Sequence, residues 1–261
     1  MAVFLSKALS IPTSLHLSMG AILRFAFNEA QRNPDYAKML ADRYHISSES
    51  DIFSCVDADA KLIAKVNRFM PNLKEYFGDK RIQAKGISQL DWLEFCTQNG
   101  LLVPDRWTKC FIESRIEISE DIQDQSFILD GYPRTVAAAK HLISYLNRYK
   151  IPIIKLLHLS ISKQEMMLRA KQRERDDDTE GSLRSRYVFY VENVQPSVDY
   201  MKRVLGANKV ALIDAHQPVF TNSGNASHFD LQASIANVAM DSLFSMGIPR
   251  DICRDLVRQH V

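Results

Sequence analysis

Short apolar runs alternate with longer segments of helical periodicity between residues 126 and 214, and this alternation constrains the fold more than any other feature. Strands are predicted at Ser126–Asp130, Pro152–Leu159 and Val210–Ile213, with helices over 135–149 and from residue 162 onward. Strands that alternate with helices are typical of right-handed crossovers and a parallel sheet. The sequence therefore predicts an α/β fold.

Elsewhere, local signals predict mostly helices. Residues 1–10 suit a short helix, and Ser18 is placed to cap a second one. The helical periodicity over residues 34–96 is expected to break at Pro71 and at Gly78. After the last predicted strand, residues 220–228 are polar and are expected to form a loop, followed by two helices.

The first predicted strand ends in a turn that carries an arginine, Asp130-Gly131-Tyr132-Pro133-Arg134. Three more arginines come after the next strand: Arg169, Arg175 and Arg186. Arginine presents a planar fork of donors that matches phosphate oxygens. A solvated charge run at a helix end is the alternative, and it would be favoured if the arginines stood alone. Together with the upstream turn, they indicate a site for several phosphate charges.

These residues resemble the nucleoside monophosphate kinase family, of which adenylate kinase is the type member. Five motifs stand in the family's order, and they are Ser18 to Arg24, Gly100 to Asp105, Asp130 to Arg134, the arginines Arg169, Arg175 and Arg186 with Asp177 and Asp178, and Val210 to Asp214. The resemblance implies a three-layer, P-loop NTPase-like parallel sheet with helices on both faces.

The same resemblance divides the chain into regions. The kinase-like core would comprise residues 1–32 and 97–220, with a short lid at about 169–178. Residues 33–96 would be a helical insertion in the monophosphate-binding arm, and residues 221–261 a C-terminal helical extension.

The family's first strand and the glycine-rich loop after it are missing from this sequence. That loop holds the ATP phosphates with backbone N–H groups and a lysine, whereas this chain has no Gly-Lys dipeptide and its first glycine is Gly20. By the resemblance, the missing strand would lie between the strand ending at Asp130 and the one at Ile153 to Leu159. Its loss would leave two unpaired edges inside the sheet. Either the start codon is assigned too late, or the chain is a decayed relative that closes the gap in another way.

The resemblance also implies catalytic roles. Phosphoryl transfer needs positioning, charge neutralisation and exclusion of water. Arg175 and Arg186 would reach the transferred group, and Arg169 would lie over the triphosphate of ATP. Asp130 would help to order Mg²⁺ through its waters, at the sheet edge where ligands of open α/β folds bind. Gln217 falls where the family places a backbone carbonyl against the adenine of ATP.

For the acceptor, Arg24 and Arg134 would hold the phosphate of the nucleoside monophosphate. Two departures weaken the readout of the base, because Met19 stands where adenylate kinases have threonine and Ala138 where they have glutamine. AMP specificity is therefore not expected, since hydrogen-bonded sites discriminate better than apolar ones. The other residues of this site would be Leu101, Leu102, Val103, Gly131, Tyr132 and Pro133.

Three functional hypotheses stay open. With an upstream P-loop, the protein would be a nucleoside monophosphate kinase that uses ATP and Mg²⁺. If Met1 is the true start, the chain would be an inactive pseudokinase that keeps part of a nucleotide site as a scaffold. Alternatively, the insertion and the last helix, residues 249–261, would bind a protein partner.

Composition restricts the class of protein further. Hydrophobic residues make up 46% and charged residues 25%, which is ordinary for a soluble globular protein. The net charge of +2 is too small to predict binding to nucleic acid or to membranes. The four cysteines are scattered, with no Cys-x-x-Cys pair, so neither a zinc-bearing lid nor a disulfide framework is expected. A cytoplasmic location is the expectation.

Overall fold

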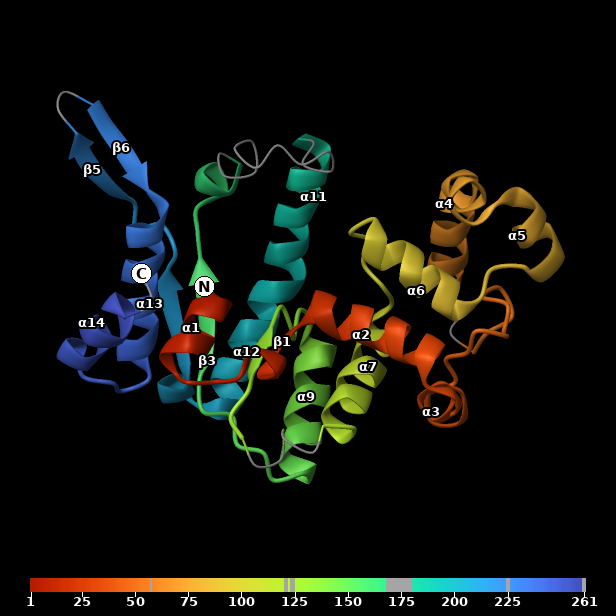
Figure 1. Ribbon diagram of the computed structural model, residues 1–261, viewed down its shortest axis with the longest axis horizontal. Coiled ribbons are helices and arrows are strands. Elements are labelled where there is room, and N and C mark those ends of the chain that lie inside the picture. Colours follow the sequence, from red (N-terminus) through yellow and green to blue (C-terminus); the bar gives the residue numbers. More distant parts are fainter. Residues whose placement is uncertain (57, 120–121, 123–124, 168–179, 224–225, 260–261) are drawn as a thin grey trace. The chain divides into compact units, whose positions relative to one another are not determined.

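The computed structural model describes residues 1–56, 58–119, 122, 125–167, 180–223 and 226–259. The chain divides into two compact units, the first comprising Met1–His16 and Ser126–Val261 and the second Leu17–Gln125. The described residues form a mixed α/β structure that is mostly helical, with short strands (Figure 1). The domain boundaries at residues 32, 96 and 220 stay predictions.

The second unit is built mainly from helices. They are α2 (Met19–Arg32), α3 (Pro34–Tyr44), α4 (Ala60–Phe77), α5 (Asp79–Lys85), α6 (Gln89–Gln98) and α7 (Asp105–Glu117). Three large aromatic side chains, Trp92, Trp107 and Phe111, are completely buried among them. These aromatic rings supply much of the apolar area that stabilises a helical unit of this size.

Two of the predicted helix signals had different outcomes. Ser18 caps α2 as predicted, because its hydroxyl accepts a hydrogen bond from the backbone N–H of Ala21. The expected break at Pro71 is wrong, since α4 continues through this proline and ends only before Gly78. Leu62 and Leu73 are buried on either side of Pro71, and their packing outweighs the helix-breaking tendency of proline.

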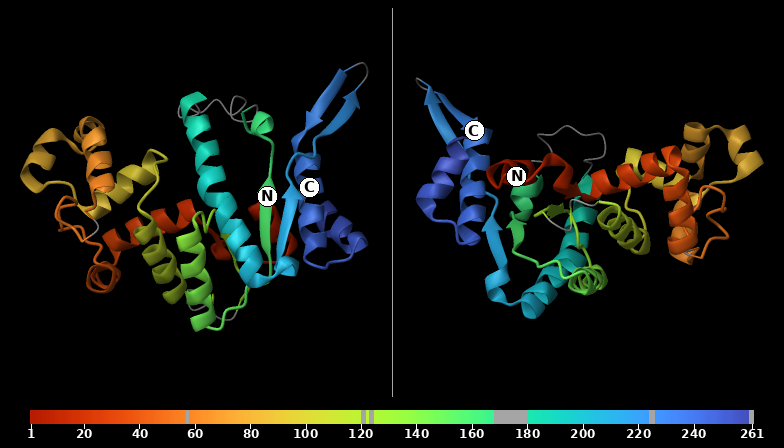
Figure 2. Two further views of the ribbon diagram at one scale, coloured as in Figure 1. Left: turned by 180° about the vertical axis from the view of Figure 1, so that it is seen from behind. Right: turned by 60° about the horizontal axis from the view of Figure 1, so that its bottom comes forward.

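The first unit contains the predicted parallel strands. β3 (Leu156–Ser160) pairs in parallel with β4 (Val210–Asp214), and the two run side by side in Figures 1 and 2. β2 (Ile128–Asp130) is bonded to β1 (His16–Ser18), whose first residue belongs to the same unit. Among the described residues, no strand joins β2 to β3, so the strands form two-stranded sheets instead of one continuous sheet.

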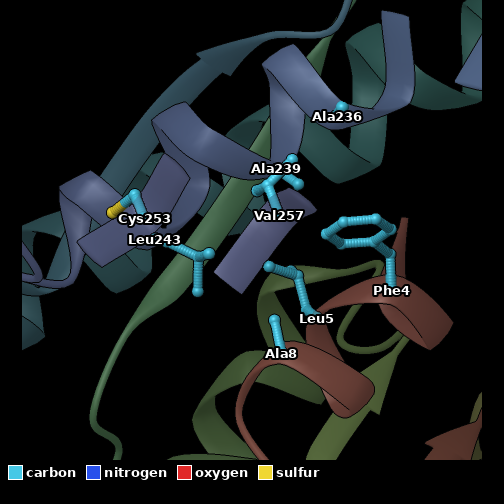
Figure 3. Packing of buried hydrophobic residues seen from close by; sticks show 8 residues of the cluster. All are labelled: Phe4, Leu5, Ala8, Ala236, Ala239, Leu243, Cys253 and Val257. Carbon is cyan, nitrogen blue, oxygen red and sulfur yellow. The ribbon is translucent and has the colours of Figure 1, made fainter. Parts of the chain in front are cut away.

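Helices flank β3 on both faces. The helices of the first unit are α1 (Ala2–Ala8), α9 (Val136–Arg148), α11 (Glu180–Phe189), a π-helical turn (Tyr190–Val194), α12 (Gln195–Leu205), α13 (Leu231–Ser245) and α14 (Arg250–Arg258). Leu156 packs against the cluster of α9 and α12 that contains Ala139 and Met201. Leu157 packs against the opposite cluster, formed by α1, α13 and α14 (Figure 3). Successive side chains of a strand point to opposite faces, so β3 has a helical layer on each side.

The C-terminal region begins with a hairpin, where the sequence predicts a loop. β5 (Val219–Ser223) pairs antiparallel with β6 (Ala226–Asp230), and the pair leads into α13 (Figure 1). The rings of Phe220 and Phe229 meet across the two strands at a centroid distance of 5.8 Å. The loop expected at residues 220–228 is therefore wrong, because a cross-strand aromatic pair stabilises a hairpin there. The two helices predicted after it are confirmed.

Within the described ranges, every helix is too short or too polar to cross a membrane.

Candidate functional site

The turn after β2 holds an arginine at the carboxyl end of a strand. Gly131 has a φ of +79°, a left-handed conformation that glycine adopts without strain, and the Tyr132–Pro133 peptide bond is cis. The Nε of Arg134 donates to the carbonyl of Gly131 at 2.7 Å. This bond uses one of the five guanidinium donors, and the side chain is exposed. The hydrogen bond from Nε to the turn thus fixes the orientation of the guanidinium and of its two terminal nitrogens.

α9 begins directly after this turn and fixes it. The hydroxyl of Thr135 accepts a hydrogen bond from the N–H of Ala138, which caps the helix. Tyr132 donates from its phenol to the carbonyl of Ala138 at 3.3 Å. Ala138 is itself buried, 1% exposed, so its methyl group is packed in the fold. The turn is therefore tied at both ends to rigid secondary structure, as a binding site requires.

Asp130 ends β2 with a carboxylate that is largely accessible. Its side chain is 53% exposed, and its Oδ2 lies 3.7 Å from the Nε2 of His16. That distance is too long for a hydrogen bond, so His16 is a neighbour and leaves the carboxylate oxygens available. A largely exposed carboxylate at the end of a strand suits Mg²⁺, which keeps several waters and takes one or two carboxylates in phosphate sites.

Polar side chains also gather where β3 and β4 end. Ser160 and Asp214 are the last paired residues, and the N–H of Ala215 donates to the carbonyl of Ser160 at 2.8 Å. Just beyond, the Nδ1 of His216 lies 3.1 Å from the Oε1 of Glu165. The segments that follow the two strands are thereby connected at one edge of the sheet.

The side chain of Gln217 is used within the fold. Its Nε2 donates to the carbonyl of Asp214 at 3.0 Å and to the carboxylate of Asp241 at 2.8 Å. These bonds hold the segment after β4 against α13. The role of the Gln217 backbone toward the adenine of ATP stays a prediction.

Arg186 is exposed on α11 and lies one turn before the π-helical turn at Tyr190–Val194. Tyr190 opens the π-helical turn, and its phenol lies 3.0 Å from the Nε2 of His158 on β3. Burial lowers the pKa of His158 and raises that of Tyr190. π-helical turns occur frequently at functional sites. Here one of them links the helix that carries Arg186 to the strand beneath it.

The remaining arginines of the predicted site are Arg169 and Arg175, in the predicted lid at 169–178. Both lie outside the described residues, so their roles stay predictions.

The second unit holds the other predicted residues of the acceptor site. Met19 is buried at the start of α2, and Arg24 is exposed on the same helix, with its guanidinium over Gly20. In the loop before α7, Leu101 is half-buried and Val103 buried, while Leu102 is 51% exposed. The carbonyl of Leu102 accepts a hydrogen bond from the Nζ of Lys65 at 2.5 Å.

The sequence did not indicate three of these contacts: Glu165 with His216, His158 with Tyr190, and Lys65 with Leu102. Each joins residues from different elements of the structure. In the described ranges, no three His, Cys, Asp or Glu side chains converge into a metal cluster. A metal at Asp130 would thus depend on ligands from phosphate and water.

Comparison with known proteins gives one family. The family model described as adenylate kinase matches residues 83–205, a stretch that includes the Leu102 loop, the Asp130–Arg134 turn and Arg186. The match ends at the end of α12 and so excludes the hairpin and the last two helices.

Individual relatives carry the same description. The adenylate kinase of Mycolicibacterium vanbaalenii is 38% identical over 101 residues, covering 39% of this chain and 55% of the relative. That of Cyanothece sp. is 34% identical over 124 residues, covering 46% of this chain and 61% of the relative. That of Fervidobacterium nodosum is 26% identical over 167 residues, covering 52% of this chain and 74% of the relative. The chain spans little more than half the length of the first two.

Proposed function

Because this chain belongs to the adenylate kinase family through residues 83–205, we propose that the whole protein transfers a phosphoryl group from ATP to a nucleoside monophosphate, giving ADP and a nucleoside diphosphate. The observation that carries the proposal is the Asp130–Arg134 turn, with an accessible carboxylate and a directed guanidinium at the end of β2. The proposal requires a phosphate-binding loop supplied upstream, since the sequence has no Gly-Lys dipeptide.

The arginines account for most of the proposed chemistry. Phosphoryl transfer places charge on the phosphoryl oxygens, and catalysis consists largely of positioning and neutralising that charge. Arg134 and Arg24 are proposed to bind the monophosphate. Arg186, together with Arg169 and Arg175 of the lid, is proposed to neutralise the group in transfer. Arginine suits these roles because its donors can bind two phosphate oxygens at once.

Mg²⁺ bound with ATP would neutralise charge on the phosphates. Asp130 is proposed to hold it through coordinated waters, and its accessible oxygens fit that role.

A complete sheet is part of the same proposal. Ile128 of β2 and Leu157 of β3 both pack against the cluster formed by α1, α13 and α14. A further parallel strand between β2 and β3 would turn the two short sheets into one, with the P-loop NTPase order expected of the family. Its carboxyl end would then lie beside Asp130 and Ser160, where ligands of such sheets bind.

The proposal is tested by assaying ADP formation from ATP with AMP, GMP, CMP and UMP in turn. Protein produced with the in-frame upstream sequence is expected to turn over at least one monophosphate, whereas the chain as printed is expected to show none. Arg186→Ala should lower turnover by 10-fold or more, since a lost transition-state contact of this kind costs roughly 10² or more. Arg184→Ala on the same helix is the matched control. An extended protein that is inactive with all four acceptors contradicts the proposal.

A pseudokinase is the second candidate. This candidate predicts nucleotide binding without turnover, even in the extended protein. Measuring binding and turnover on the same preparation separates the two functions.

A further inference from the structure

Lys65 connects the predicted insertion to the loop that the proposed function assigns to the acceptor base. It lies in the second turn of α4, and its Nζ donates to the carbonyl of Leu102, 37 residues further along the chain. Both residues belong to the second unit. The helix of the insertion thus contributes a positively charged side chain to the loop before α7.

The surroundings of this lysine are apolar. The Nζ lies 5.9 Å from the centre of the Trp92 ring, which is completely buried. Cys96 is also completely buried, and burial raises the pKa of its thiol to about 12, so that it is neutral at pH 7. Burial lowers the pKa of Lys65 itself. The amino group is therefore partly removed from water, and none of these neighbours is an anion.

An ammonium group has three donors and no acceptor. Among the described residues, the hydrogen-bond partner of Lys65 is the Leu102 carbonyl, which uses one donor. A partly desolvated donor gains more from a fixed acceptor than one in bulk water does. The two other donors therefore lie ready for an acceptor beside Leu102, whose side chain is exposed.

We infer that Lys65 determines the specificity of the acceptor site by donating a hydrogen bond to the oxygen that guanine carries at C6 and uracil at C4, so that the preferred acceptor carries one of these two bases. This inference rests on the proposed function. An amino group, such as those of adenine and cytosine, would place N–H donors against an ammonium that cannot accept them. Met19, in the same unit, offers no polar side chain to compensate. Charge-assisted bonds to oxygen are the stronger kind, and a site built on them discriminates well.

The test is calorimetric titration of GMP, UMP, AMP and CMP into the full chain and its variants. The wild type should bind GMP or UMP at least 10-fold more tightly than AMP and CMP. Lys65→Met should remove that difference, and Lys65→Arg, which keeps the donors, should restore part of it. Lys61→Met, an exposed lysine one turn earlier on α4, is the matched control and should keep the wild-type preference. Thermal unfolding of all variants checks that they fold.

Each result of these titrations either supports or overturns the inference. A wild type without base preference overturns the inference, and so does a preference that survives Lys65→Met. An equal loss for all four nucleotides in Lys65→Met also overturns it, since Lys65 would then only position the loop. If the wild type binds no monophosphate at all, the proposed function fails, which is a different result from binding without preference.

Discussion

Two parts of the first unit bury their apolar side chains to very different extents. In the cluster of α1, α13 and α14, Leu5 is 4% exposed and Leu243 is 0% exposed (Figure 3). On the β3–β4 sheet, by contrast, Leu159 is 40% and Leu212 68% exposed. The helices therefore form a closed core, while the β3–β4 sheet leaves large apolar side chains exposed.

The difference follows from how the two kinds of element become buried. A helix needs one apolar stripe covered, which two neighbouring helices can do. A parallel strand needs neighbours on both edges and cover on both faces. In the described structure, β4 has β3 along one edge only, and β3 has β4 along one edge only. The comparison teaches that the helices of this unit have their apolar faces covered, whereas, among the described residues, the strands of its β3–β4 sheet each lack a neighbour along one edge.

The comparison predicts its largest effect in the helical core. Leu243→Ala should lower the free energy of unfolding by about 3 kcal/mol, because it leaves a cavity at a fully buried position. Leu212→Ala, the matched change on the sheet, should cost about 0.5 kcal/mol or less. Urea unfolding of both variants measures the difference. Equal losses would show that the sheet is as well packed as the core.

A smaller effect is expected where the sheet layer meets the site. Thr135→Ala removes the cap of α9, which covers β3 through Ala139, and should cost about 1 kcal/mol. Thr135→Ser keeps the hydroxyl and should retain most of the stability. If both substitutions cost the same, the cap hydrogen bond is not the cause.

The smallest effect concerns pH. Burial lowers the pKa of His158, so the unfolded chain takes up a proton at higher pH than the folded chain does. Stability should then fall as the pH drops below about 6.5, the usual pKa of histidine, toward the lowered pKa of the folded state. The difference in melting temperature between pH 7.5 and pH 5.5 should be smaller in His158→Gln than in the wild type. His45→Asn, at an exposed histidine, should behave as the wild type; an unchanged difference in His158→Gln refutes the effect.

Much of the fold follows from local signals in the sequence. Ser18 and Thr135 cap helices where short polar residues precede apolar periodicity, and the β3–β4 pair follows from strand–helix alternation. The hairpin escaped prediction because the polar sequence between Phe220 and Phe229 obscured these two aromatic residues. The predicted helix break at Pro71 was wrong because the packing on both sides of this proline cannot be seen in the local sequence.

The candidate site likewise has one part that the sequence could indicate and another that it could not. The Asp130–Arg134 turn is contiguous, so the sequence alone could indicate it. The bond from Lys65 to Leu102 and the contact of His158 with Tyr190 join residues 37 and 32 positions apart. Such contacts depend on how helices pack, which periodicity does not specify.

The most direct test of the account concerns the turn at the end of β2. Binding of a dinucleotide in which five phosphates join two adenosines should be measured by calorimetry, with Mg²⁺, on protein produced with the in-frame upstream sequence, for the wild type and for Arg134→Ala. Arg148→Ala, at the far end of α9, is the control. The account predicts that the wild type and Arg148→Ala bind and that Arg134→Ala binds at least 10-fold more weakly, because a charged donor to phosphate is lost. Equal binding by Arg134→Ala, or no binding by the wild type, would contradict a phosphate site at this turn.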